Sequence, residues 1–216
     1  QEIRKPMNNV LNYVGQLQDK VAVANEAQLS DGIQENADYL LHLIDNILYL
    51  SRLEAHMVEF APRPNNFAEV FETHCRTGWM KYQNPDTNYV VESPYTQLEV
   101  NIDSDNLGHA IKQVCANAAQ HTKSGSIKAR YDYIGRRLII SIDDTGEGIQ
   151  QDELERLNQI DTDNVQSSKG LGLAITKEII SQMNGTFEIN SEEGSGTTVY
   201  ISIPCHATAI KRKKIA

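Results

Sequence analysis

The apolar residues of this chain change their spacing once, near residue 60, and that change divides the chain into two unlike parts. Before it, apolar residues recur every three or four positions, the period of one helix face, without strand-like alternation. A first stripe consists of Met7, Val10, Val14, Leu17 and Val21. A second stripe consists of Ile33, Ala37, Leu40, Ile44, Ile47 and Leu50, widened by Leu41, Leu43 and Leu48. We therefore predict two antiparallel helices, connected around residues 24–28.

A lone pair of helices cannot enclose a hydrophobic core, and the second helix is apolar around more than half of its circumference. Pairing two such hairpins across a homodimer would bury both stripes in a four-helix bundle. The alternative is that the hairpin packs onto the rest of its own chain. Pro62 and Pro64 disfavour helix in the residues before them. We place the domain boundary there, with a helical hairpin at 1–60 and a linker at 61–66.

From Phe67 onward the pattern is one of mixed helices and strands, which predicts a second domain at 67–206. Helices are expected at 67–81, 104–120, 152–157 and 171–183, the second of them capped by Asp103 or Ser104. Alternating patterns predict strands at 89–91, 98–102, 127–133, 138–143, 186–191 and 197–203. Gly135 and Arg136 mark a turn between two strands. Antiparallel hairpins with helices grouped to one side form an α/β sandwich, so the whole chain falls in the α+β class.

Charge and composition exclude several classes of partner. The chain has 29 acidic and 20 basic residues and a formal net charge of −9, which argues against a nucleic-acid partner. The one basic cluster, Lys211–Lys214, lies in a segment at 207–216 that we expect to be a solvated tail. No apolar run approaches the ~18 residues of a membrane span, so no direct membrane contact is expected. The three cysteines lack C-x-x-C spacing, which favours reduced thiols in a cytosolic compartment. The chain opens with neither Met nor a signal peptide, and we interpret it as part of a longer protein.

The first segment that could carry chemistry is Asp144-Thr145-Gly146-Glu147-Gly148, which follows an apolar strand pattern. Two glycines flanking one residue let the backbone turn sharply and approach a ligand closely. An aspartate at a strand end can accept a hydrogen bond from the amino group of a ring. A plain hairpin turn explains the same five residues, so the motif alone leaves both interpretations open.

The second segment is Ser167-Ser168-Lys169-Gly170-Leu171-Gly172-Leu173, which opens a predicted helix. Glycines at a helix N-terminus leave N–H groups and the positive end of the helix dipole accessible to a phosphate, and Lys169 adds a cation. The alternative is a loop-to-helix junction with flexible glycines. The segment is not a dinucleotide fingerprint, because no strand leads directly into it, and it lacks the G-x-x-x-x-G-K pattern of a Walker loop.

The third candidate is Asn117, late on the helix predicted at 104–120. The core-facing stripe of this helix is Leu107, Ala110, Ile111, Val114 and Ala118, and Asn117 lies at its edge. Mg²⁺ prefers hard oxygen ligands and keeps several waters, so the carboxamide oxygen of Asn117 could hold this ion. A surface asparagine with satisfied hydrogen bonds is the alternative interpretation.

Taken in order, the three segments resemble the ATP-binding domain of sensor histidine kinases. The segment Gly194–Val199, leading into a strand pattern that stops at Pro204, is similar to the last motif of that family. Glu2–Asn8 resembles the family's phosphoacceptor motif, and Leu43–Glu54 resembles the end of its second bundle helix. The resemblance covers nearly the whole chain. It implies a dimeric four-helix bundle followed by an α/β sandwich of the histidine kinase and Hsp90 ATPase class.

The resemblance also implies an activity. Such a core binds ATP and Mg²⁺, moves the γ-phosphoryl group onto a bundle histidine, and passes it to the receiver domain of a response regulator. Phosphoryl transfer depends mainly on positioning and charge neutralisation, which Mg²⁺ and backbone amides supply. By family, the chain would be the cytoplasmic part of a membrane-anchored sensor that works as a homodimer.

Carried over by position, the resemblance gives each motif residue a role. Asn117 would hold Mg²⁺, Asp144 would accept a hydrogen bond from the adenine amino group, and Glu2 would accept or orient a proton beside the phosphoacceptor. The remaining ATP-binding positions would be Gly146, Gly148, Lys169, Gly170, Gly172 and Thr197.

Several positions depart from the family pattern, and Gln1 is the most consequential. It stands where the family has its phosphorylated histidine, and an amide has no ring nitrogen that could attack phosphorus. Lys5 replaces the Thr or Asn that assists dephosphorylation, which puts phosphatase activity in doubt. The other departures are Gln113 and Gln120 on the helix of Asn117, Ser168 and Lys169 in the second motif, and a lid whose apolar residues are Leu154, Leu157 and Ile160 in place of Phe.

Two accounts of Gln1 therefore stay open: an engineered change in an active kinase core, or a natural pseudokinase that acts as a nucleotide-binding signalling dimer. A more distant alternative is an ATPase of the gyrase or Hsp90 type. The helical hairpin at 1–60 argues against that alternative, because those ATPases have none.

Overall fold

The computed structural model describes residues 7–12, 14, 26–80, 82–158 and 168–213. The helices are α2 (Glu26–Glu54), α3 (Phe67–Met80), α4 (Ser104–His121), α5 (Gln151–Asn158) and α6 (Ser168–Gln182). The strands are β1 (Arg63–Asn66), β2 (Thr87–Glu92), β3 (Tyr95–Ile102), β4 (Gly125–Ile134), β5 (Arg137–Asp144), β6 (Thr186–Glu192), β7 (Gly196–Pro204) and β8 (His206–Arg212).

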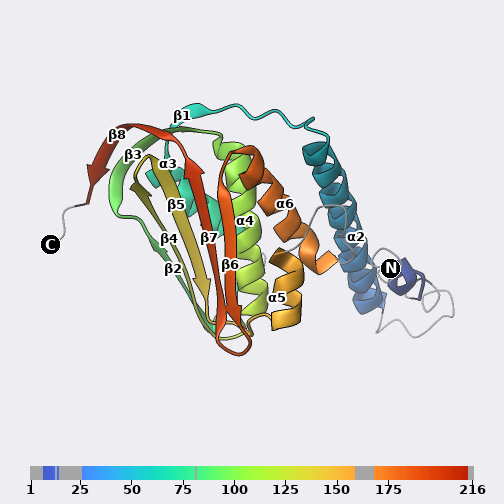
Figure 1. Cartoon of the computed structure of the whole chain (residues 1–216). Coiled ribbons are helices and arrows are strands. Elements are labelled where there is room, and N and C mark those ends of the chain that lie inside the picture. The colour runs from blue at the N-terminus through green and yellow to red at the C-terminus, as the bar shows by residue number, and fades with distance from the viewer. Residues whose placement is uncertain (1–6, 13, 15–25, 81, 159–167, 214–216) are drawn as a thin grey trace.

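A five-stranded sheet in the order β2-β4-β5-β7-β6 carries α3, α4 and α6 on one face (Figure 1). The core lies between these helices and the sheet, because the alternate residues Leu138, Ile140 and Ile142 of β5 are buried there. β4 and β5 form an antiparallel hairpin through Gly135 and Arg136, which both have positive φ. The α/β sandwich and the α+β class predicted from the sequence are confirmed.

The pairing of β2 differs from the hairpins that the sequence predicted. β2 pairs with β4 in parallel, so that Tyr89 lies opposite Ile127, and the sheet is mixed. The chain between these two strands passes through β3 and α4 before it returns, and a parallel pair requires such a crossover connection.

A second, three-stranded sheet in the order β1-β3-β8 corrects two predictions. The predicted linker at 61–66 contains β1, and the predicted solvated tail at 207–216 contains β8. Both pair antiparallel with β3, β1 through Asn65 opposite Val100 and β8 through Ile210 opposite Leu98. These strands exist because β3 offers two free edges, and neither segment has a hydrophobic pattern strong enough to predict a strand by itself.

Part of the basic cluster is held in place by this second sheet. The guanidinium of Arg212 donates to Asp132 Oδ1 at 3.0 Å and lies 5.1 Å from the ring centre of Tyr95. The hydroxyl of Tyr95 also donates to the same carboxylate. The pattern of charges alone gave no sign of these contacts.

The N-terminal end of α4 is formed as the sequence predicts. Asp103 is the N-cap, and its Oδ1 accepts a hydrogen bond from the N–H of Asn106 at 2.9 Å. Its other oxygen accepts from the N–H of Ala61 at 2.8 Å, which ties the preceding segment to this helix. The helix that carries Asn117 is therefore fixed at its start.

The helix α2 has two apolar faces with different surroundings. Leu43, Leu50 and Leu53 are buried, and the backbone carbonyl of Leu53 accepts from Gln182 of α6 at 2.6 Å. On the other side, Leu41 and Leu48 are exposed to 59% and 57%. One face of α2 therefore packs onto its own chain, whereas Leu41 and Leu48, on another side of the helix, are exposed.

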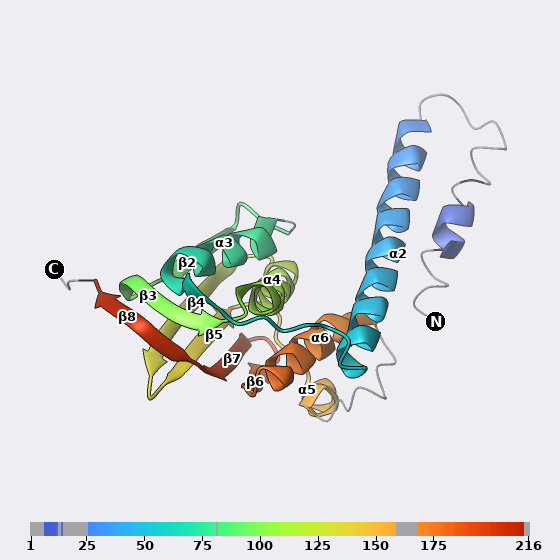
Figure 2. The ribbon, with the colours of Figure 1, turned by 90° about the horizontal axis from the view of Figure 1, so that it is seen from above.

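The first predicted helix is described at residues 7–12 and 14, where the chain is helical and lies beside α2 (Figure 2). Asn9 donates to the Asn36 side-chain oxygen at 3.2 Å. Leu17 and Val21 of the predicted stripe lie outside the described residues, as do Gln1 and Glu2. No helix in the described part of the chain is long and apolar enough to cross a membrane.

Candidate functional site

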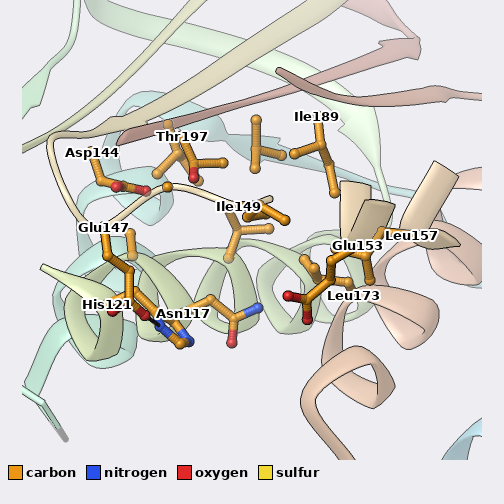
Figure 3. A pocket seen from close by; sticks show the side chains of 15 residues that line it. Asn117, His121, Asp144, Glu147, Ile149, Glu153, Leu157, Leu173, Ile189 and Thr197 are labelled. Carbon is orange, nitrogen blue, oxygen red and sulfur yellow. Dashed lines mark hydrogen bonds and ion pairs between the residues drawn. The ribbon is translucent and has the colours of Figure 1, made fainter. Parts of the chain in front are cut away.

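A pocket of about 130 Å³ lies between α4, the end of β5, the loop after it, α5 and α6 (Figure 3). Its apolar walls are Val114, Ala118, Ile142, Ile149, Leu157, Leu173, Ile189 and Val199. Its polar lining includes Asn117, Asp144 and Thr197 together with the backbone of Gly148. Four positions that the sequence assigned to one ATP site, taken from three separate segments, thus lie around one pocket.

Asp144 is the last residue of β5 and lies in register with Thr197 of β7. Its Oδ1 accepts a hydrogen bond from the N–H of Gly146 at 2.9 Å. Burial raises the pKa of the Asp144 carboxyl, while the N–H groups of Gly146 and Thr197 and the nearby His121 act in the opposite direction. A carboxylate held this way at an apolar pocket can accept a further hydrogen bond from a ligand.

The two glycines of the first motif are required by neighbouring backbone. A Cβ on Gly146 would overlap the carbonyl oxygen of His121, and a Cβ on Gly148 would overlap that of Glu192. Gly148 also has a φ of +69°, which disfavours other residues. From the sequence, these glycines were expected to form a sharp turn that approaches a ligand. The described contacts show a close approach to the protein's own chain, and the ligand role stays a prediction.

The second motif forms the start of α6, with Lys169 and Gly170 in its first turn. Gly172 packs against α4, because a Cβ there would overlap the side-chain amide of Gln113. Leu173, the next residue, lines the pocket. The start of α6 is therefore next to the pocket, as a phosphate-binding role requires. That role of Lys169, Gly170 and Gly172 stays a prediction, and residues 159–167 lie outside the described residues.

The segment that was predicted to be a lid contains α5, which forms part of the pocket wall. Leu154 is buried, and Glu153 and Leu157 line the pocket. The third apolar residue that the sequence assigned to the lid, Ile160, is outside the described ranges.

Two residues at the pocket, His121 and Glu147, were not predicted from the sequence. His121 is the last residue of α4, and its Nδ1 lies 2.6 Å from Glu147 Oε1 in the loop after β5 (Figure 3). Both residues line the pocket. A signal was present, since His121 follows Asn117 by one helical turn and Glu147 stands between the two glycines of the motif at 144–148, whose pattern is D-x-G-x-G.

The residues around the pocket fit a nucleotide with a metal ion. The apolar walls suit a flat ring, and Asp144 supplies the acceptor that an amino group on such a ring needs. Asn117 offers a carboxamide oxygen on the α4 side of the same pocket. The described residues contain no group of three or more His, Cys, Asp and Glu that could hold a metal alone. Mg²⁺ in nucleotide sites usually takes one or two protein ligands together with phosphates and waters, and the role of Asn117 toward this ion stays a prediction.

Comparison with known proteins identifies the family. Residues 1–56 match the family model of the His Kinase A (phospho-acceptor) domain. Residues 102–207 match that of the histidine kinase-, DNA gyrase B- and HSP90-like ATPases. The chain belongs to the histidine kinases. The match at 1–56 is to a phospho-acceptor domain, which argues against the gyrase or Hsp90 alternative and confirms the resemblance.

Named relatives agree with this assignment. The chain is 26% identical over 94% of its length to the autoinducer 2 sensor kinase/phosphatase LuxQ of Vibrio parahaemolyticus. It is 28% identical over 99% of its length to the sensor histidine kinase RcsC of Escherichia coli. It spans about a quarter of the length of these relatives, 25% of the first and 23% of the second.

Solved structures show the same fold. The histidine kinase AdeS of Acinetobacter baumannii superposes with a TM-score of 0.73 at 20% identity, over 93% of this chain and 95% of that one. Full-length ShkA, solved in complex with AMPPNP, superposes with a TM-score of 0.69 at 23% identity, over 95% of this chain and 44% of that one.

Proposed function

We propose that this chain is a two-component kinase core that binds ATP with Mg²⁺ in the pocket between α4 and β5 and that cannot phosphorylate itself as written. The observation that carries the proposal is that Asn117, Asp144 and Thr197, from three separate motifs, line one apolar-walled pocket in a histidine kinase chain. We further propose a homodimeric helical hairpin at 1–60, a nucleotide-binding domain from residue 67 onward, and a response regulator receiver domain as partner. The cytoplasm is the compartment that this function requires.

Each residue at the pocket has a proposed task. The Asp144 carboxylate accepts a hydrogen bond from the adenine amino group, and the apolar walls exclude water from the two faces of the ring. Asn117 holds Mg²⁺ through its side-chain oxygen, and the N–H groups at the start of α6 face the phosphates with Lys169. The metal ion supplies charge neutralisation at the phosphoryl group.

Gln1 is the proposed reason for the lack of autophosphorylation. The phosphoacceptor of this family needs an imidazole nitrogen as nucleophile, and an amide nitrogen is not nucleophilic. Glu2, Arg4 and Pro6 still frame the position as the family motif does. A kinase core with Gln1 would bind nucleotide without retaining a phosphoryl group.

The Gln1→His variant is expected to become labelled by γ-³²P-ATP with a bond that is stable in base and labile in acid, whereas the unchanged chain stays unlabelled. Both proteins should bind MgADP equally in calorimetry, because the pocket is the same. The variant should be extended upstream, since an acceptor at a free helix terminus lies on a frayed turn. Labelling of the unchanged chain would contradict the proposed role of Gln1.

The second candidate function is a natural pseudokinase, and the altered second motif favours it together with Gln113 and Gln120. It predicts that the extended Gln1→His variant binds MgADP normally and remains unlabelled. In that case Ser168 and Lys169 are the first positions to restore to the family pattern.

Exposed apolar side chains on α2 predict a homodimer. Leu41, Ile44, Ile47 and Leu48 are all exposed, and a contiguous apolar surface of this kind marks an interface. Light scattering at roughly tens of micromolar should give the mass of two chains. Exchanging both Leu41 and Leu48 for Glu should give the mass of one chain, with the same thermal unfolding midpoint, because both side chains are exposed. A monomer mass for the unchanged chain would remove the bundle from the proposal.

A further inference from the structure

We propose that His121 is a positioning residue of the nucleotide pocket, which holds the D-x-G-x-G loop against the end of α4 through the side chain of Glu147. The inference rests on the proposed nucleotide binding, and it adds a residue pair that the family motifs did not mark in this chain. Its basis is the geometry at the mouth of the pocket (Figure 3).

Three contacts join His121 to this loop. The Nδ1 atom of His121 lies 2.6 Å from Glu147 Oε1, and the N–H of Glu147 donates to the carbonyl oxygen of His121 at 3.2 Å. Gly146 lies so close to the same carbonyl that a Cβ would overlap it. The side-chain contact therefore adds to two backbone contacts at one point of the loop.

The loop is tied to the sheet by separate bonds. The N–H of Thr145 donates to the carbonyl of Ser126 at 3.1 Å, and the N–H of Gly194 donates to the carbonyl of Glu147 at 2.8 Å. These hydrogen bonds join the loop to β4 and to the turn between β6 and β7. The contacts of His121 instead join the loop to α4, the helix that carries Asn117. His121 thus connects the wall beside Asp144 to the helix that offers the proposed metal ligand.

The solvent exposure of His121 and Glu147 sets the expected loss of nucleotide affinity when their contact is removed. The side chains of His121 and Glu147 are 44% and 62% exposed, so solvent weakens their interaction. A short, charge-assisted contact that pre-organises a site still reduces the ordering cost of binding. We expect a loss of about fivefold in nucleotide affinity when the contact is removed, with the fold intact.

The test compares two substitutions at one position. His121→Phe keeps a ring of similar size and removes the nitrogen, whereas His121→Asn places an amide N–H near the position of Nδ1. In calorimetry with MgADP, His121→Phe should bind about fivefold more weakly than the unchanged chain, and His121→Asn should stay within about twofold of it. Thermal unfolding without nucleotide should give the same midpoint for both variants, which separates loop positioning from loss of structure.

A double-mutant cycle with Glu147→Ala identifies the partner. Glu147→Ala alone should cost at least about fivefold, and the double variant with His121→Phe should bind no more weakly than Glu147→Ala alone, because both changes remove the contact between His121 and Glu147. Glu147→Ala also keeps the test decisive if His121→Phe does not fold.

The possible failures are distinguishable. If the unchanged chain binds no MgADP, the proposed function fails and this inference fails with it. If the unchanged chain binds and His121→Phe or Glu147→Ala binds equally well, this inference alone is overturned. Additive losses in the double variant, or a His121→Asn variant as weak as His121→Phe, would also overturn it, because His121 would then act by another route.

Discussion

Replacing Asp144 by Asn should weaken the binding of MgADP by about 100-fold in calorimetry. The carboxylate is half-buried, and its Oδ1 already accepts a hydrogen bond from the N–H of Gly146. An asparagine can keep that bond with its oxygen, and it then turns an N–H₂ group toward the adenine amino group, so that two donors face each other. An unpaired buried donor in a site built for an acceptor is costly to binding, which sets the expected magnitude.

The neighbouring residue offers a matched control. Asp143 lies on the opposite face of β5, where its Oδ2 is 2.9 Å from the guanidinium of Arg130, so Asp143→Asn should leave nucleotide affinity unchanged. Equal affinities for Asp144→Asn and the unchanged chain would remove Asp144 from the site.

The raised pKa of Asp144 makes both the stability of the chain and its nucleotide binding depend on pH. Because burial raises its pKa, the folded chain favours the neutral carboxyl, and this contribution to stability is lost as pH rises from the ordinary aspartate value through the raised one. At neutral pH, Asp144→Asn should therefore unfold at the same temperature as the unchanged chain or higher. Nucleotide binding should decline as pH falls through the raised pKa, because a protonated carboxyl can present a donor to the adenine amino group.

Gly148→Ala should lower the free energy of unfolding by about 3 kcal/mol or more, measured by urea denaturation. A Cβ at Gly148 would overlap the carbonyl oxygen of Glu192, and the backbone has a φ of +69°. The overlap is with backbone, which cannot move aside as a side chain does. The loop after β5 would have to shift away from β6, and the pocket would lose part of its wall.

The Gly194→Ala variant separates the two causes of the expected loss of stability, steric overlap and a positive φ. Gly194 has a φ of +79°, and a Cβ there would meet nothing within 4 Å. Only the conformational strain remains, so the expected cost is about 1 kcal/mol. If Gly148→Ala were no more costly than Gly194→Ala, the close approach to Glu192 would not constrain the loop.

The sequence by itself determined those features that depend on local chemistry. The change from a helical to an alternating period located the helices and most strands, because burying one face of an element imposes its period on the chain. Asp103 was recognisable as a cap, and Gly135 with Arg136 as a turn. The order of Asn117, Asp144 and the glycines of α6 was enough to identify the family. That Asn117 and Asp144 lie at one pocket could be inferred only through that resemblance.

Tertiary structure decided the features that depend on what a distant segment offers. β1 and β8 are strands because β3 has two free edges, and the short, proline-containing or basic sequences of these strands carry little preference of their own. One face of α2 is covered because α6 lies beside it, which no pattern within α2 could reveal. Gly148 must be glycine because of a carbonyl 44 positions away in the chain, at Glu192. His121 meets Glu147 for the same reason: hydrogen bonding and steric contact act over a few ångströms, and only the fold decides which residues come within that range.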